Sequence, residues 1–222
     1  GSPRRNGNGR HDRKCPDLEK VENMSVNLHA EKKAGVPILY HGTSLEGLVG
    51  IVHSDSMAGF GSDQLAGVSL TRCPDVAAIF AKAKSAERAH DIQWNVKHGA
   101  DAHATYEPLE LCQWLVDPVT GGSGAVISFD WSAMTSQFDL APIDEIGDNS
   151  EDEVRVMGWN INGVVPLITS VAIQNHEQFI AYCRELVGLD GSFRRTISRI
   201  NELLPEHCPA LSGLARNRAA PR

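Results

Sequence analysis

The most constraining feature of this 222-residue chain is the segment 38–44, where a short apolar run leads directly into His-Gly-Thr-Ser. The run 38–40 predicts a strand. Apolar residues then recur at helical spacing, which predicts a helix over 44–54: Leu45, Leu48, Val49 and Val52. Thr43 and Glu46 form the Thr-x-x-Glu pattern of a capping box. His41 is therefore expected at a strand-to-helix junction, a common position for ligand contacts.

A histidine at the end of a strand more often serves as a structural hydrogen-bonding group than as a functional one. A functional interpretation of His41 therefore requires partners elsewhere in the chain. Four recognised kinds of site have no matching motif. The sequence contains no G-x-x-x-x-G-K-[ST] loop and no complete G-x-G-x-x-G, no H-E-x-x-H, and no G-x-S-x-G. A P-loop, a doubly wound dinucleotide fold, a zinc-protease site and a hydrolase triad are thus disfavoured, and we expect no metal site.

Charge is unevenly distributed around a net value of −7. Residues 1–20 hold six Lys or Arg against three acids, whereas residues 139–153 hold seven acids and no base. The acidic charge outside the N-terminal tail argues against a broad surface for binding duplex nucleic acid, because such a surface needs clustered basic residues. No run approaches the roughly 18 apolar residues that span a bilayer, so we expect no membrane association. Five cysteines without a C-x-x-C pair fit free thiols and a cytoplasmic location.

The remaining chain predicts an α+β protein. We expect a basic disordered tail and an N-terminal helix over 1–36, a core over 37–174, and C-terminal helices with a frayed tail over 175–222. Within the core and the C-terminal part, strands are expected at 67–72, 125–129, 153–157 and 164–173, and helices at 76–88, 109–116, 176–187 and 192–204. Asn162-Gly163 predicts a hairpin turn. Residues 130–150 are expected to be irregular, and 57–66 to form a flexible loop over a site.

Three strand-borne elements together resemble the ADP-ribosyltransferase superfamily. They are Tyr-His-Gly-Thr at 40–43, Gly-Val-Ser-Leu-Thr-Arg at 67–72, and Glu-Asp-Glu-Val at 151–154, and the resemblance covers about 37–173. It implies a split, mixed β-sheet core with flanking helices. The first motif resembles that of the diphtheria-toxin and poly(ADP-ribose) polymerase branch. At the second motif that branch has tyrosine where this chain has Ser69, and Ser-x-Thr instead resembles the toxin branch with Ser-Thr-Ser.

The resemblance implies NAD as substrate and assigns a role to particular residues. His41 would hold a ribose hydroxyl, and the Gly42 backbone would bind the nicotinamide amide. Glu153 would stabilise the cationic ribose of the transition state. Glu151 matches the first acid of the Glu-x-Glu motif of arginine-modifying members, where it positions the acceptor. Further NAD-binding candidates are Thr43, Ser69, Thr71, Arg72 and Tyr106. Arg72 would pair with the pyrophosphate or simply cap its strand, and the aromatic residue stacking on nicotinamide would be Tyr106, Phe60 or Phe80.

We therefore expect an NAD-dependent ADP-ribosyltransferase that moves ADP-ribose to a macromolecule, a protein more readily than a nucleic acid. Two alternatives stay open: an NAD glycohydrolase-type toxin, and a catalytically silent binding or inhibitory module. An RNA 2′-phosphotransferase would need several basic residues where this chain is acidic. Small size and free thiols fit an effector or toxin acting in a cytosol, either its own or that of a host after delivery.

Overall fold

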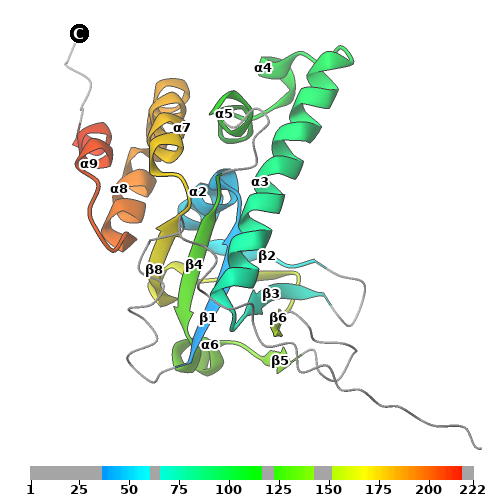
Figure 1. Cartoon of the computed structure of the whole chain (residues 1–222), viewed down its shortest axis with the longest axis vertical. Helices are drawn as coiled ribbons and strands as arrows, with labels where there is room; N and C mark the ends of the chain where they lie inside the picture. Colours follow the sequence, from blue (N-terminus) through cyan, green and yellow to red (C-terminus); the bar gives the residue numbers. More distant parts are fainter. Residues whose placement is uncertain (1–36, 61–65, 117–122, 143–151, 217–222) are drawn as a thin grey trace, which may run out of the picture.

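A computed structural model describes residues 37–60, 66–116, 123–142 and 152–216. Within these ranges the chain forms a six-stranded sheet and a separate two-stranded sheet, flanked by helices (Figure 1). In spatial order the large sheet consists of β5 (Leu140–Pro142), β6 (Glu153–Met157), β3 (Gly67–Thr71), β1 (Ile38–Thr43), β4 (Ala125–Asp130) and β8 (Ile168–Ile173). The small sheet pairs β2 (Ser56–Ala58) with β7 (Asn160–Asn162). The expected α+β class is confirmed.

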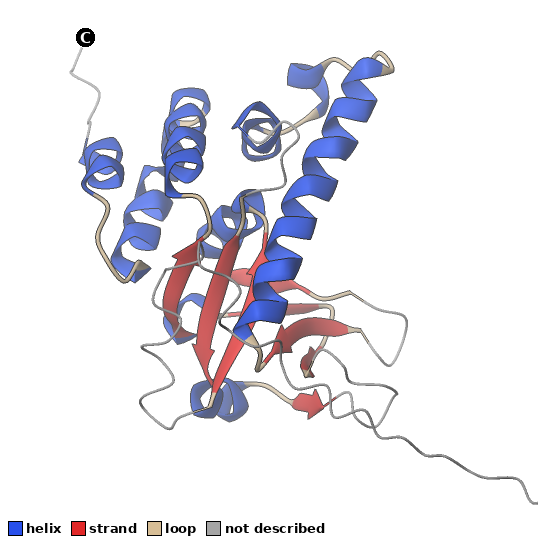
Figure 2. Ribbon diagram, viewed as in Figure 1, coloured by secondary structure: helices blue, strands red, loops and turns tan. Residues whose placement is uncertain are grey.

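The sheet differs from the expected mixed sheet because every pairing among its described strands is antiparallel. It does divide into two parts. β1 is aligned with β4 along its whole length, whereas β1 and β3 are aligned at Tyr40 and Thr71. Figure 2 shows β1, β4 and β8 running together, with β3 and β6 in a different direction. β1 and β3 therefore separate beyond Tyr40, toward His41 and Thr43.

The helices lie on both faces of the sheet. They are α2 (Leu45–Ser54), α3 (Pro74–Lys97), α4 (Ala102–Thr105), α5 (Pro108–Val116), α6 (Trp131–Gln137), α7 (His176–Leu189), α8 (Arg194–Leu203) and α9 (Pro209–Arg216), with 3-10 turns η5 (Val165–Leu167) and η6 (Gly191–Phe193). Among the described helices, none combines the length and apolar character needed to cross a bilayer.

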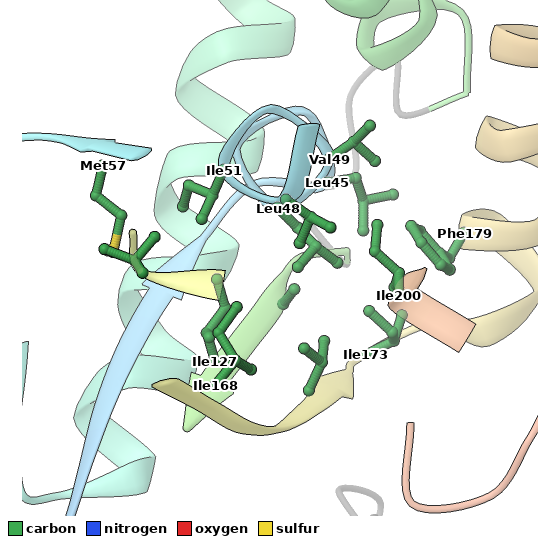
Figure 3. Packing of buried hydrophobic residues seen from close by; sticks show 14 of the residues in the cluster. Leu45, Leu48, Val49, Ile51, Met57, Ile127, Ile168, Ile173, Phe179 and Ile200 are labelled. Carbon is green, nitrogen blue, oxygen red and sulfur yellow. The ribbon is translucent and has the colours of Figure 1, made fainter. Parts of the chain in front are cut away.

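The main core lies between one face of the sheet and helices α2, α7 and α8. Leu45 and Leu48 of α2 belong to the same cluster as Ile127 of β4 (Figure 3). Phe179 of α7 and Ile200 of α8 are also part of this cluster. All five side chains are completely or almost completely buried. At about 1.5–3 kcal/mol for each buried large aliphatic or aromatic side chain, this cluster is the principal source of stability. The C-terminal helices thus share one core with the sheet.

Helix α3 covers the opposite face through small residues. Ala77, Ala78 and Ala81 pack against Tyr40 and Val126 in a second buried cluster. The helix lies so near β1 that a Cβ atom added at Gly42 would be 1.8 Å from the carbonyl oxygen of Ala77. Real Cβ contacts do not approach this distance, so glycine is required here for the helix to lie across the strand.

The expected start of α2 is displaced by one residue. The strand predicted over 38–40 continues to Thr43, and Ser44 is the N-cap, its hydroxyl accepting a hydrogen bond from the Gly47 amide at 3.0 Å. The Thr43–Glu46 capping box is therefore wrong. Glu46 instead forms an ion pair with Arg88 of α3. His41 consequently lies inside a strand rather than at its end.

Several segments are more ordered than their sequences suggest. Residues 130–150, expected to be irregular, contain α6 and β5, and the tail after 204 forms α9, whose Leu211 joins the main core. The helix expected over 76–88 runs from Pro74 to Lys97. Asn162-Gly163 does not form a hairpin, because β7 pairs with β2 while β8 pairs with β4. The strands at 67–72, 125–129 and 153–157 and the helices at 109–116, 176–187 and 192–204 are confirmed. The strand expected over 164–173 is shorter than predicted, because Val165–Leu167 form η5 and the strand β8 begins at Ile168.

Three expectations concern segments outside the described residues. They are the tail and helix of 1–36, the central part of the loop 57–66, and Glu151. The described ends of that loop contain β2 and an antiparallel bridge between Phe60 and Gly67.

Candidate functional site

A cleft of about 560 Å³ lies where β1 and β3 separate. This size is within the range of small-molecule sites. Its lining comes from β1, α2, β2, β3, the first half of α3, and β6. The described residues that line it are Tyr40, His41, Gly42, Thr43, Gly47, Ile51, Met57, Ala58, Phe60, Gly67, Val68, Ser69, Leu70, Thr71, Val76, Ala77, Phe80, Lys84, Glu153 and Arg155. The three motif strands β6, β3 and β1 are neighbours in the sheet, so residues more than 100 positions apart meet in one cleft.

His41 bridges the two parts of the sheet. Its Nδ1 atom is 2.9 Å from the carbonyl oxygen of Ser69. A carbonyl oxygen only accepts hydrogen bonds, so Nδ1 carries the proton. Burial lowers the pKa of His41 from its ordinary value of 6.5, and the bond to the Ser69 carbonyl opposes this with a smaller effect. The neutral ring then has a lone pair on Nε2, with which it can accept a hydrogen bond from a ligand hydroxyl.

Ser69 also connects to the acid on the next strand. Its hydroxyl donates a hydrogen bond to Oε1 of Glu153. The same oxygen accepts from Arg155, with Nη2 at 2.8 Å and Nε at 3.2 Å. The side chains of Arg155 and Glu153 are 19% and 17% exposed. His41, Ser69 and Glu153 therefore form one connected chain across β1, β3 and β6, and the carboxylate accepts hydrogen bonds from both Ser69 and Arg155.

Gly67 makes room for the side chain of Arg155. A Cβ atom added at Gly67 would be 2.5 Å from Cγ of Arg155 and 2.9 Å from its Cδ. The aliphatic part of Arg155 thus lies over the strand at Gly67, and from there the guanidinium reaches Glu153.

The neighbouring motif residues make structural contacts. Gly42 lines the cleft, but the contact that requires glycine is with the backbone of α3. Thr43 is buried beside Gly47, where an added Cβ would be 2.0 Å from Thr43 Oγ1. Thr71 Oγ1 accepts a hydrogen bond from the Cys73 amide at 3.0 Å, at the start of α3.

Aromatic side chains reach the cleft from two places. Phe60 follows β2 and is 80% exposed, and Phe80 of α3 is 41% exposed; both line the cleft. Tyr106 does not. It lies at the end of α4, where its hydroxyl accepts a hydrogen bond from Asn95 Nδ2 at 2.8 Å. Of the three aromatic candidates, the structure brings Phe60 and Phe80 to the site.

Arg72 lies outside the described lining of the cleft. It forms a two-pronged ion pair with Asp152, whose carboxylate oxygens are 2.9 and 3.0 Å from Nε. Asp152 adopts a left-handed backbone conformation, with φ of 51°. Of the two roles expected for Arg72, this geometry favours fastening the end of β3 to the start of β6.

Two basic lining residues were missed in the sequence. Arg155 is two residues after Glu153 on a strand, so simple alternation places both on the same face. Lys84 follows Phe80 by four residues on α3, which also puts the two on one side. Its described partner is Glu87, at 2.9 Å in an exposed pair. Among the described residues, no group of three or more His, Cys, Asp or Glu side chains is arranged to hold a metal ion.

Comparison of the chain with protein-family models, with curated proteins and with solved structures found no match.

Proposed function

We propose that the protein is an NAD-dependent ADP-ribosyltransferase. The observation that carries the proposal is the hydrogen-bonded chain from His41 through Ser69 to Glu153 along the wall of the cleft. These residues come from the three motifs whose order resembles that superfamily. The three motifs do not individually require that their strands be neighbours in the sheet. That residues from all three line one cleft therefore supports the resemblance.

The chemistry of the lining fits the nicotinamide, ribose and diphosphate parts of NAD. A neutral His41 can accept a hydrogen bond from a ribose hydroxyl, and Phe60 or Phe80 can stack on the nicotinamide ring. Lys84 provides positive charge for the diphosphate. Glu153 supplies the negative charge that a cationic ribose requires.

The proposed reaction breaks the bond between C1′ of the ribose and N1 of nicotinamide. The electron pair of that bond moves to the pyridinium ring, which leaves as neutral nicotinamide, and positive charge develops on the ribose. A carboxylate held near that ribose stabilises the transition state more than the ground state. Glycosidases use carboxylates against the same kind of cation. The two donors to Glu153 Oε1 hold the carboxylate in a fixed orientation, which is the condition for this effect.

The acceptor in this proposal is a macromolecule, with protein favoured over nucleic acid because of the acidic net charge of −7. The four described cysteines, Cys73, Cys112, Cys183 and Cys208, are free thiols. This is in accord with action in a reducing cytosol.

The test is to measure nicotinamide release from NAD and transfer of labelled ADP-ribose to proteins of a lysate. Glu153→Gln keeps the shape of the side chain but removes its charge, and should reduce both by about 100-fold or more. NAD should still raise the melting temperature of this variant. Glu206→Gln, an exposed change elsewhere, is the matched control. Full activity in Glu153→Gln, or no melting shift with NAD in the unaltered protein, would overturn the proposal.

A further inference from the structure

Arg155 lies beside the carboxylate at the centre of the candidate site. It donates to Glu153 Oε1 from two nitrogens, Nη2 at 2.8 Å and Nε at 3.2 Å. The two side chains are 19% and 17% exposed, so their charges are weakly screened by solvent. The pair as a whole is neutral. The guanidinium therefore offsets part of the negative charge with which Glu153 would stabilise a cationic ribose.

The other charges of the cleft indicate which group can compensate for Arg155. With His41 neutral, the charged residues of the described lining are Lys84, Glu153 and Arg155, which together leave one positive charge. The diphosphate of NAD is doubly negative and its nicotinamide ring is positive, so the net charge of NAD is complementary to that of the cleft. Phosphate is also the part of NAD that a guanidinium binds most strongly.

We propose that Arg155 binds a phosphate of NAD while it remains bound to Glu153. This inference rests on the proposed function. A guanidinium carries five N–H donors in a planar fork, so one arginine can contact a carboxylate along one edge and a phosphate along another. The charge of the phosphate then offsets that of Arg155, and the charge of Glu153 acts on the ribose. Phosphate binding thereby assists the breaking of the C1′–N1 bond in addition to raising affinity.

The fold places Arg155 for this double contact. Its aliphatic part lies over Gly67 of β3, where an added Cβ atom would be 2.5 Å from Cγ and 2.9 Å from Cδ. It follows Glu153 by two residues on β6, so both side chains belong to the same face of the strand and line the same cleft. A phosphate that enters the cleft thus meets a guanidinium that is already beside the carboxylate.

Two truncated substrates that differ by one phosphate test the inference. Nicotinamide mononucleotide retains the phosphate next to the nicotinamide ribose, and nicotinamide riboside lacks it. We measure kcat and KM for nicotinamide release from each, and from NAD, with the full-length protein. We expect kcat to be at least about tenfold higher for the mononucleotide, because its phosphate offsets Arg155.

The three substrates separate failure of this inference from failure of the proposed function. Equal kcat values for the mononucleotide and the riboside would show that the phosphate contributes only to affinity, and would overturn the inference. Cleavage of NAD without cleavage of the mononucleotide would overturn it as well. Both results would leave NAD cleavage intact. Absence of nicotinamide release from all three substrates would instead reject the proposed function.

A variant of Arg155 assigns the effect of the phosphate to this residue. Arg155→Gln should bring the ratio of the two kcat values close to one, whereas general damage to the site would lower both values and preserve their ratio. Arg199→Gln removes an exposed charge paired with Glu202 on α8, and as the control it should keep the ratio. An unchanged ratio in a folded Arg155→Gln protein would contradict the inference. Should this variant not fold, Arg155→Lys takes its place, because an ammonium lacks the planar fork and should also lower the ratio; an unchanged ratio would again contradict the inference.

Discussion

The Nδ1 atom of His41 on β1 lies 2.9 Å from the carbonyl oxygen of Ser69 on β3, at the place where these strands separate. A side-chain hydrogen bond thus connects two strands whose aligned pair is Tyr40 and Thr71. The structural and functional interpretations of His41 are therefore compatible, since the bond that holds the sheet also fixes the tautomer of the ring.

The stability of the protein should depend on the protonation of His41. Burial lowers its pKa below 6.5, so below that pH the unfolded chain binds more protons than the folded one. The free energy of unfolding should consequently fall as pH decreases from about 6.5 toward the lower folded value. His41→Asn keeps a hydrogen-bond donor near the position of Nδ1 but does not titrate. Urea unfolding at pH 7.5 and 5.5 should show a smaller loss in this variant.

The control for this experiment is His90→Asn, because the side chain of His90 is 75% exposed. It should lose stability between the two pH values as the unaltered protein does. An identical loss in His41→Asn would show that other groups cause the pH dependence.

Removing the Ser69 hydroxyl should weaken catalysis. Ser69→Ala deletes one of the donors to Glu153 Oε1 but keeps the carbonyl that binds His41. Hydrogen bonds to charged groups contribute about 1.5–3 kcal/mol, so kcat for nicotinamide release should fall about tenfold to 100-fold. Ser136→Ala, whose hydroxyl donates to the carbonyl of Ala133 on exposed α6, should leave kcat unchanged. Equal kcat values in the two variants would be evidence against a role for Ser69.

Enlarging Gly42 should destabilise the fold. In Gly42→Ala the new methyl group meets the Ala77 carbonyl, which is backbone and cannot rotate away. Overpacking of this kind costs about 1–3 kcal/mol, measurable as a lower denaturant midpoint. Gly188→Ala, in α7 with nothing within 4 Å of the added atom, should instead be neutral or stabilising by about 0.5–1 kcal/mol. Equal midpoints for both variants would contradict the close packing of α3 on β1.

Local patterns predicted most of the elements near the site. Alternation from Glu153 identified β6, and the i, i+3, i+4, i+7 spacing identified α2. Such signals are periodic and need only neighbouring residues. The extension of β1 to Thr43 was not predicted because residues 41–43 are held in the strand by their pairing with β4, a segment distant in the sequence.

Features that depend on distant contacts were predicted less well. Leu211 alone is a weak indication of a helix in the sequence, and its burial in α9 depends on the core formed by α7 and α8. Tyr106 was a reasonable aromatic candidate by residue type, but the length of α3 carries it away from the cleft. Arg155 could have been found from its spacing to Glu153, yet its contact with that residue also needs the space above Gly67, which lies on another strand.

The contact between Gly42 and α3 changes what a His-Gly-Thr motif indicates about the fold and function of a chain. The fold requires glycine at this position, because a side chain there would overlap with the backbone of α3. A related chain without the proposed activity would therefore still be expected to have glycine at this position. Among related sequences, retention of Ser69 and Glu153 together would indicate selection for chemistry, whereas the glycine alone would indicate only a shared fold.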